Sequence, residues 1–428
     1  MRLDLMHPAD QLVTVMHRIY SSGLTTMSGG NLSIREPNGD LWVTPGSIDK
    51  GALTRSDMVC IHPDLSQSGF RKPTSELQFH QAIYKACDRV QAILHAHSPA
   101  LVTFSIMNQV PSVNLIPNTR VVCGHVGLAP YARMGSAELG DKLAAEFRKG
   151  YSAVLLENHG ICVAAENLSQ AYKIFETLEY SARIELMARR VGPVNALTEE
   201  QIDLARTKAH TRLSDFKPRH HSSEELGLRR DMVATIQRAL DQKLFTSTQG
   251  TLSVRLDDGS FLITPYGRDR RLIQEEHLVL MHRSMKESGK TPSRAVFLHE
   301  LIYYRQPEVR AIICAQPAHL MVYTLTDAVL DVRQMPESYV MLRQIPKYPY
   351  GFNYLEPQKV AALFGPQTPA ILLANDGVIV TGQSLLQAYD RFEVAEFAAR
   401  AQLDIPAPGL GRPLDEERIA DLDRYFPL

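Results

Sequence analysis

The sequence lacks the usual features of membrane, secreted and nucleic-acid-binding proteins. Apolar runs such as Ala370–Ala374 are far shorter than the ~20 residues that span a bilayer. The first ten residues carry acids and a proline in place of an apolar signal segment. The formal net charge is -1, which indicates no basic surface for nucleic acid. We therefore expect a cytoplasmic protein with neither a nucleic-acid nor a membrane partner.

Cysteine is scarce, and its pattern argues against disulfides. The chain has five cysteines and no CxxC pair. An odd and scattered set does not form a disulfide framework and agrees with a reducing compartment. We expect each to be a small buried apolar side chain. The five are Cys60, Cys87, Cys123, Cys162 and Cys314.

An internal repeat organises the chain. Pro73–His97 aligns without gaps with Pro292–Gln316, and eight of the 25 positions are identical. Leu155–Arg183 aligns in the same way with Leu372–Arg400, with 14 of 29 positions identical. Two copies of one domain are therefore predicted. The predicted limits are 1–213 for the first copy, 214–223 for a polar linker and 224–428 for the second copy.

Each copy mixes helical and strand-like patterns. Apolar residues at three- and four-residue spacing predict helices, and short β-rich runs predict strands. This mixture predicts an α/β domain in which helices flank a mostly antiparallel sheet, in three layers (α/β/α). The main predicted helices are Asp10–Ser21, Glu76–Ala86 and Leu168–Arg190, and the main buried strands are Val90–His95 and Ala153–Leu156.

Three histidines in the first copy suit a metal ion. His95 and His97 follow a buried strand at a spacing of two, which places both side chains on one face. His159 follows a second buried strand, and Gly160 permits a tight turn after it. Three imidazoles with an open fourth position are typical of a catalytic zinc site. For the HxH pair alone, a structural role at the end of a strand is the favoured interpretation.

Glu76 adds a carboxylate at the start of a predicted helix, where Thr74 or Ser75 could be the N-cap. A carboxylate near the metal could move a substrate proton. The alternative is a surface glutamate favoured by the helix dipole.

The second copy serves as an internal control. Its scaffold positions persist, whereas all four proposed site residues change together, which indicates that they formed one functional unit. The replacements are Cys314 for His95, Gln316 for His97, Asp376 for His159 and Ala295 for Glu76.

In combination, the motifs SGGNLSIR, VTPGS, PTSELQFH, HAHSP and ENHG resemble the class II aldolase/adducin family. The resemblance covers Asp10 to about Arg190 and, in degenerate form, the second copy. It implies that His95, His97 and His159 bind Zn²⁺ or another divalent metal and that Glu76 is the catalytic acid/base. It also implies a site for a substrate phosphate or another anion, formed by Gly30, Asn31, Thr44, Gly46, Ser47, Thr74 and Ser75.

Two departures from the family pattern bear on the reaction. Leu115 stands where fuculose-phosphate aldolases carry a tyrosine proton donor, and residues 110–137 contain no Asp or Glu for the acid that the 4-epimerases use. The expected activity is a zinc-dependent aldolase that cleaves a C–C bond in a ketose or ketose phosphate through a metal-stabilised enediolate. The alternatives are a decarboxylase or epimerase of sugar (acid) phosphates and a non-catalytic, adducin-like interaction protein.

The family usually forms four-fold rings. A homo-oligomer is therefore expected, namely a dimer whose four domains imitate such a ring.

Overall fold

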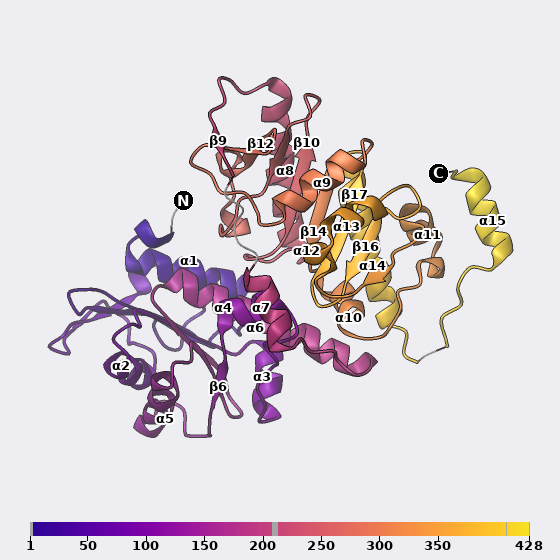
Figure 1. The fold of residues 1–428 in the computed structure, drawn as a ribbon. Coiled ribbons are helices and arrows are strands. Elements are labelled where there is room, and N and C mark those ends of the chain that lie inside the picture. Colours follow the sequence, from indigo (N-terminus) through magenta and orange to yellow (C-terminus); the bar gives the residue numbers. More distant parts are fainter. Residues whose placement is uncertain (1–2, 208–212, 408, 428) are drawn as a thin grey trace. The chain divides into compact units, whose positions relative to one another are not determined.

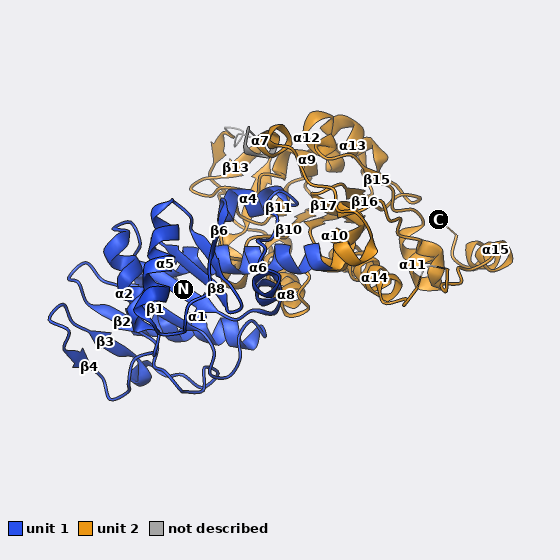
Figure 2. Cartoon of the chain, turned by 90° about the horizontal axis from the view of Figure 1, so that it is seen from below, with its two compact units in different colours: residues 1–186 blue, residues 187–428 orange. Residues whose placement is uncertain are grey.

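The computed structural model describes residues 3–207, 213–407 and 409–427. The chain forms two compact units, which Figure 2 shows in different colours. Unit 1 comprises residues 1–186 and unit 2 comprises residues 187–428.

The boundary between the compact units falls within one long helix, α6 (Leu168–Val191). The end of the first predicted domain, residues 208–212, lies outside the described residues. The predicted domain limits of 1–213, 214–223 and 224–428 therefore stay a prediction.

Unit 1 is built on an eight-stranded sheet in the order β4-β3-β2-β1-β5-β8-β7-β6. Neighbouring strands are antiparallel except β6 and β7, which are parallel. The strands are β1 (Asn31–Arg35), β2 (Leu41–Val43), β3 (Val59–Ile61), β4 (Gln67–Ser68), β5 (Ala92–Ala96), β6 (Val126–Ala129), β7 (Ala153–Leu156) and β8 (Gly160–Ala165).

Helices cover both faces of this sheet (Figure 1). Successive strand residues point to opposite faces. In β5, Leu94 therefore joins a core with α1, α3 and α6, whereas Ile93 joins a core with α2 and α5. The helices are α1 (Pro8–Ser21), α2 (Leu77–Ala86), α3 (Pro99–Ile106), α4 (Pro117–Cys123), α5 (Ala137–Arg148) and α6, with short 3-10 turns at η1 (Leu3–Leu5) and η2 (Arg55–Asp57).

Unit 2 repeats this plan with a nine-stranded sheet in the order β15-β16-β17-β14-β10-β11-β12-β13-β9. Its pairings are antiparallel except β15–β16 and β13–β9. The strands are β9 (Asp215–Phe216), β10 (Thr251–Arg255), β11 (Phe261–Ile263), β12 (Val279–His282), β13 (Met285–Glu287), β14 (Ala311–Ala315), β15 (Lys347–Tyr348), β16 (Ala370–Leu373) and β17 (Gly377–Gly382).

The helices of unit 2 also pack in two cores, one with α8, α10 and α14 and one with α9 and α13. They are α7 (Glu199–Thr207), α8 (Ser223–Asp241), α9 (Val296–Arg305), α10 (Ala318–Leu325), α11 (Pro336–Leu342), α12 (Phe352–Leu355), α13 (Pro357–Leu363), α14 (Leu385–Leu403) and α15 (Glu416–Tyr425), with 3-10 turns η3 (Arg270–Leu272), η4 (Glu275–His277) and η5 (Val332–Gln334).

Strand registers match between the units. In unit 1, Asn31 pairs with His95, and in unit 2 Thr251 pairs with Cys314. The turns between the last two central strands also correspond, because Leu156 pairs with Gly160 as Leu373 pairs with Gly377. These observations confirm the predicted fold class of two α/β domains with mostly antiparallel sheets between helices.

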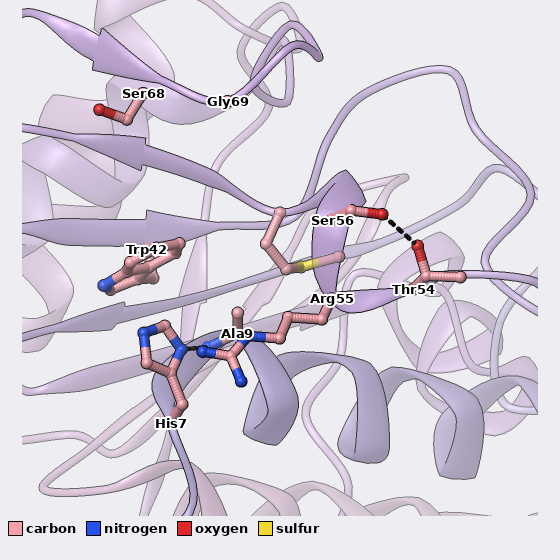
Figure 3. Close-up of a pocket in the computed structure, with 9 residues that line it drawn as sticks. His7, Ala9, Trp42, Thr54, Arg55, Ser56, Ser68 and Gly69 are labelled. Atoms are coloured by element: carbon pink, nitrogen blue, oxygen red, sulfur yellow. Dashed lines mark hydrogen bonds between the residues drawn. The ribbon is translucent and has the colours of Figure 1, made fainter.

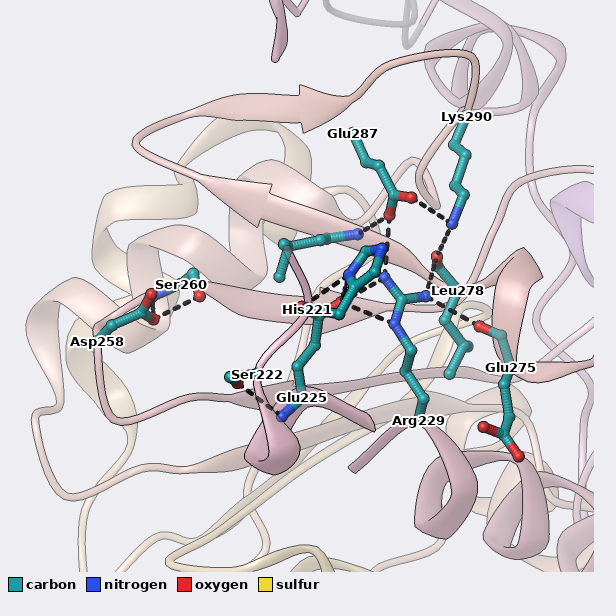
Figure 4. A network of polar contacts seen from close by, with 11 residues as sticks. His221, Ser222, Glu225, Arg229, Asp258, Ser260, Glu275, Leu278, Glu287 and Lys290 are labelled. Carbon is teal, nitrogen blue, oxygen red and sulfur yellow. Dashed lines mark hydrogen bonds and ion pairs between the residues drawn. The ribbon is translucent and has the colours of Figure 1, made fainter. Parts of the chain in front are cut away.

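The segment predicted as a linker is not entirely irregular. Residues 215–216 form β9, which pairs in parallel with β13 at the sheet edge. Next to it, His221 contacts Glu225 at 2.9 Å, and Glu225 accepts a hydrogen bond from the buried Arg229 (Figure 4).

One expectation about cysteine was wrong, since Cys314 is only partly buried and lies 3.1 Å from His299 Nε2.

Candidate metal and proton-transfer site

His95 is fixed by the sheet that carries it. It is the fourth residue of β5, and its side chain is fully buried. Its Nδ1 donates a hydrogen bond to the carbonyl oxygen of Ile161 on β8, at 2.9 Å. Because a neutral imidazole has one N–H, this bond leaves Nε2 with its lone pair available for a ligand.

The other two histidines converge on the same point. His97 Nε2 lies 3.0 Å from His95 Nε2. His159 stands in the turn from β7 to β8, after Asn158 in a left-handed conformation (φ 54°). The ligating atoms of the three histidines all lie within 4.8 Å of one another. The structure therefore brings together the three residues that the sequence predicted as ligands.

Glu76 faces the histidines from α2. Its Oε2 lies 3.4 Å from His95 Nε2, and its Oε1 lies 3.7 Å from His159 Nε2. The expectation that Thr74 or Ser75 caps the helix was wrong, because Glu76 itself occupies the N-cap position with no side-chain capping bond. The surface alternative was wrong too, since Glu76 is only 6% exposed.

Burial keeps these histidines neutral. It lowers the pKa of His95 to about 3, with a further effect of the neighbouring His97. Burial likewise lowers the pKa of His159 to about 3 and also lowers the pKa of His97. Their contacts with Glu76 are therefore not ion pairs. Neutral imidazoles are the form that binds a metal.

The donor set fits a divalent cation. Three neutral imidazoles and a carboxylate are ligands that zinc prefers. Two of the converging atoms, His159 Nε2 and Glu76 Oε1, are buried without a hydrogen-bond partner. A buried polar atom without a partner is costly, and a bound cation would remove that cost.

Five of the seven residues predicted for anion binding lie on two adjacent loops, Thr44–Ser47 and Thr74–Ser75. An isolated β-bridge pairs Pro45 with Pro73, and the Thr74 N–H donates to the Thr44 carbonyl at 3.2 Å. Gly46 permits this approach, because a Cβ there would lie 3.3 Å from the Pro73 oxygen. Ser47 and Ser75 are exposed, whereas Thr44 is buried and its hydroxyl accepts from the Leu32 N–H.

The two remaining residues of that set sit against the histidines. Gly30 has φ 72°, and a Cβ there would lie 2.7 Å from the His95 carbonyl oxygen. Asn31 is 3% exposed, and its amide contacts Glu76 and His80. The sequence did not single out His80 as a site residue, because its identity with His299 in the repeat is typical of a scaffold position.

Lys50 was also missed. It is 1% exposed beneath the loop at Thr44–Ser47, and its Nζ donates to the Pro45 carbonyl at 2.7 Å. Burial lowers its pKa to about 8. The repeat carried the signal, because Arg270 occupies the corresponding place in unit 2 and donates to the Gly250, Pro265 and Arg268 carbonyls.

In unit 2, Asp376 and Gln316, which replace His159 and His97, form hydrogen bonds within the protein. Asp376 accepts hydrogen bonds from Asn353 at 2.9 Å and from the Tyr354 hydroxyl at 2.8 Å. Gln316 donates to the Asp376 backbone carbonyl at 2.6 Å. Over residues 3–207, 213–407 and 409–427, the two clusters of metal-ligating side chains both lie in unit 1.

The second of these clusters comprises Asp40, Cys60 and His62. Both nitrogens of His62 already have partners, because they contact Asp40 at 2.8 Å and Ser68 at 2.7 Å. Burial raises the pKa of the Cys60 thiol to about 11, so the thiolate that binds metals is disfavoured. The histidine cluster is the better candidate.

A pocket of about 560 Å³ lies elsewhere on unit 1 (Figure 3). Trp42 and His7 stand edge to face in it, with ring centroids 4.8 Å apart, and Arg55 lies beside them. None of the predicted site residues is among the residues that line this pocket. It therefore does not bear on the metal site.

Comparison with known proteins decides the family. The model of the class II aldolase and adducin N-terminal domain matches residues 10–186 and again residues 230–403. The chain belongs to this family. The two matches agree with the repeat found in the sequence and confirm the resemblance of its motifs.

Relatives with named activities align with less than half of this chain but with nearly all of their own length. The 5-deoxy-D-ribulose 1-phosphate aldolase of Bacillus thuringiensis is 30% identical over 207 residues, 46% of this chain and 93% of that protein. The 3-oxo-tetronate 4-phosphate decarboxylase of Escherichia coli is 31% identical over 198 residues, which are 45% of this chain and 92% of that protein. A solved structure of an L-fuculose 1-phosphate aldolase is 31% identical, with a TM-score of 0.42. The match covers 46% of this chain and 93% of that one.

The family match and the two sequence relatives support a lyase-type enzyme of the class II aldolase family. Among the described residues, no helix has the length and apolarity to cross a membrane.

Proposed function

We propose that unit 1 is a zinc-dependent aldolase that reversibly cleaves the bond between the α and β carbons of a ketose or ketose phosphate. The observation that carries the proposal is the convergence of three neutral histidines and Glu76 on one buried point. His95, His97 and His159 would hold the metal. When bound, a divalent metal supplies Lewis-acid stabilisation of the negative charge that develops on substrate oxygen.

Glu76 is the proposed acid/base. In the cleavage direction its carboxylate can take the proton of the hydroxyl on the carbon that becomes the aldehyde, and can deliver that proton to the nucleophilic carbon from which the aldehyde departs. The side chain is buried, so water competes little for that proton, and Asn31 holds one of its oxygens. Glu76 Oε1 is free of hydrogen bonds and is the atom proposed to carry the proton.

The loops at Thr44–Ser47 and Thr74–Ser75 are proposed to bind the substrate phosphate. They supply the exposed hydroxyls of Ser47 and Ser75, whereas the N–H groups of Thr44, Gly46 and Thr74 already donate to backbone carbonyls. The aldolase and decarboxylase relatives are named for phosphorylated substrates, which supports this assignment.

Decarboxylation of a 3-oxo-acid phosphate is the second candidate. The same charge stabilisation would serve it, and the Escherichia coli decarboxylase is as similar to this chain as the aldolases are. The absence of a tyrosine at Leu115 also favours it, because the aldolase pattern has its proton donor there.

Unit 2 is proposed to be non-catalytic and the chain to form a homo-oligomer. A dimer measured by light scattering would agree with the expected four-domain assembly, whereas an active monomer would contradict it.

The test is a product screen with ketose phosphates and 3-oxo-acid phosphates, using wild type and Glu76→Gln with and without a chelator. We expect C–C cleavage that a chelator abolishes and that Glu76→Gln lowers by about 10²–10⁴-fold. Chelator-insensitive turnover, or full activity of Glu76→Gln, would contradict the proposal. The product identifies aldolase or decarboxylase chemistry.

A further inference from the structure

A buried chain of hydrogen bonds runs from the core to Glu76. The Tyr84 hydroxyl lies 2.8 Å from Ser33 Oγ, and Ser33 Oγ lies 2.7 Å from His80 Nδ1. His80 Nε2 lies 2.5 Å from Asn31 Oδ1, and Asn31 Nδ2 lies 2.8 Å from Glu76 Oε2. All five side chains are buried, so the chain is shielded from water.

The chemistry of the end group fixes the direction of every bond. An ionised carboxylate only accepts hydrogen bonds, so Asn31 must turn its NH₂ group to Glu76 and its oxygen to His80. His80 must then carry its proton on Nε2 and donate it to Asn31. Burial lowers the pKa of His80 to about 3, so the neutral ring has only this one N–H. Nδ1 therefore accepts from Ser33, which in turn accepts from Tyr84.

Unit 2 keeps the inner part of this hydrogen-bond network, which joins tyrosine, serine and histidine. It lacks the outer part, which joins histidine, asparagine and glutamate. Ser253 lies 2.7 Å from His299 Nδ1 and 2.7 Å from the Tyr303 hydroxyl, as in unit 1. Thr251 replaces Asn31, and its hydroxyl contacts Ser293 at 2.9 Å. The inner Ser–His–Tyr part is thus shared by both units, whereas the asparagine link occurs only where the glutamate is present.

We propose that Asn31 and His80 are positioning residues that hold the Glu76 carboxylate in place for proton transfer. Asn31 occupies Oε2, which leaves Oε1 as the oxygen directed to the reacting atoms. His80 acts one step further away, because its Nε2 proton sets which way the Asn31 amide faces. The inference deepens the proposed function and rests on it, and it gives Asn31 a role other than phosphate binding.

The two units offer a matched pair of variants. Ser33→Ala and Ser253→Ala remove the same two hydrogen bonds at corresponding, fully buried positions. Both should lower the melting temperature by similar amounts. Only Ser33→Ala should lower kcat, by about 10-fold, with KM changed less than about twofold, because a misplaced group slows the chemical step without weakening substrate binding. Equal kcat values in the two variants would overturn the proposal.

A second measurement does not depend on activity. Histidine-selective ¹⁵N labelling reports which ring nitrogen of His80 carries the proton, and His80→Gln identifies its signals. We expect a proton on Nε2 and none on Nδ1 at neutral pH. A proton on Nδ1 would turn the Asn31 oxygen towards Glu76 and overturn the proposal even if the protein is an aldolase.

Failure of the proposed function can be distinguished from failure of the positioning role. Full activity of Glu76→Gln would remove the acid/base role and with it the proposed function. Loss of activity in Glu76→Gln, together with an unaffected Ser33→Ala, would leave the function standing and reject only the positioning role.

Discussion

Gly160 shows how a residue without a side chain shapes the candidate site. It begins β8, and a Cβ at this position would lie 2.6 Å from the Ala96 carbonyl oxygen and 2.9 Å from His97 Cδ2. Real Cβ contacts are essentially never that short, so any larger residue must displace the end of β5. Such a shift would move His97 away from the other two histidines.

Gly160→Ala is therefore expected to lower both stability and metal affinity. Gly377→Ala is the control, since a Cβ at Gly377 would lie 2.3 Å from the Ala315 carbonyl oxygen at the corresponding turn of unit 2. We expect both variants to lose stability and only Gly160→Ala to lose affinity for zinc, by about 10-fold or more. Thermal unfolding and competition with a zinc-binding dye measure the two effects. Equal zinc affinity in both variants would contradict this reading of the turn.

Lys50 gives a pH-dependent prediction. Its folded pKa of about 8 lies below the usual ~10.4 of an unfolded lysine. Between these values the unfolded chain holds a proton that the folded chain has released, so this group adds stability as pH rises. This contribution to stability is complete above about pH 10.4 and is lost as the pH falls to about 8.

Lys50→Met should remove this increase in the free energy of unfolding with pH, which is on the order of 2–3 kcal/mol. The measurement is the free energy of unfolding in urea at several pH values between about 8 and 10.4, with the exposed Lys72→Met as control. Parallel curves for wild type and Lys50→Met would show that burial of this amine does not perturb its titration.

Among the elements, helix α8 is tied to its sheet by a buried ion-pair network (Figure 4). Arg229 is 3% exposed and donates to Glu225 Oε1 at 2.8 Å and to Glu287 Oε2 at 3.0 Å. It also donates to the Glu275 and Leu278 carbonyls. Removing the arginine would leave the Glu225 carboxylate with little water to solvate it.

Arg229→Leu is expected to destabilise the protein by about 3 kcal/mol, because the buried Glu225 loses its arginine partner, whereas Glu287 keeps its ion pair with Lys290 at 2.6 Å. Lys286→Met, which removes the more exposed pair with Asp215, should cost less than about 1 kcal/mol. Chemical denaturation of both variants measures the difference. Similar small losses would mean that water reaches the network in solution.

The strands and long helices could be predicted because their patterns are local. A short apolar run predicted the buried strand β7 at Ala153–Leu156, and helical spacing predicted α6 to within one residue of Val191. The local pattern did not predict the burial of Glu76, because its contact with Asn31 joins residues 45 positions apart in the sequence. Strand β9 was missed for the same reason, since two residues gain their structure only from pairing with β13.

The histidine cluster was within reach of the sequence because the second copy shows which positions change together. His80 was not, because it is identical in both copies, as a scaffold residue would be. Only the structure shows that its two copies have different partners at Nε2, Asn31 in unit 1 and Cys314 in unit 2.

For the whole molecule, the duplication separates scaffold from chemistry within one chain. Both units keep the sheet registers and the buried Ser–His–Tyr contacts, and within the described part of the chain only unit 1 brings three histidines to one point. A chain with two equivalent folds and one metal-binding set is expected to bind one metal ion. The number of metal ions bound per chain therefore tests whether unit 1 alone holds the metal site.

The most direct test of the central claim is the metal content of the purified chain, measured by inductively coupled plasma mass spectrometry after saturation with zinc and desalting. We predict about one zinc per chain, essentially none in His95→Ala, and an unchanged value in Cys314→Ala, the matched change in unit 2. Zinc-free wild type, or a full complement of zinc in His95→Ala, would contradict the account.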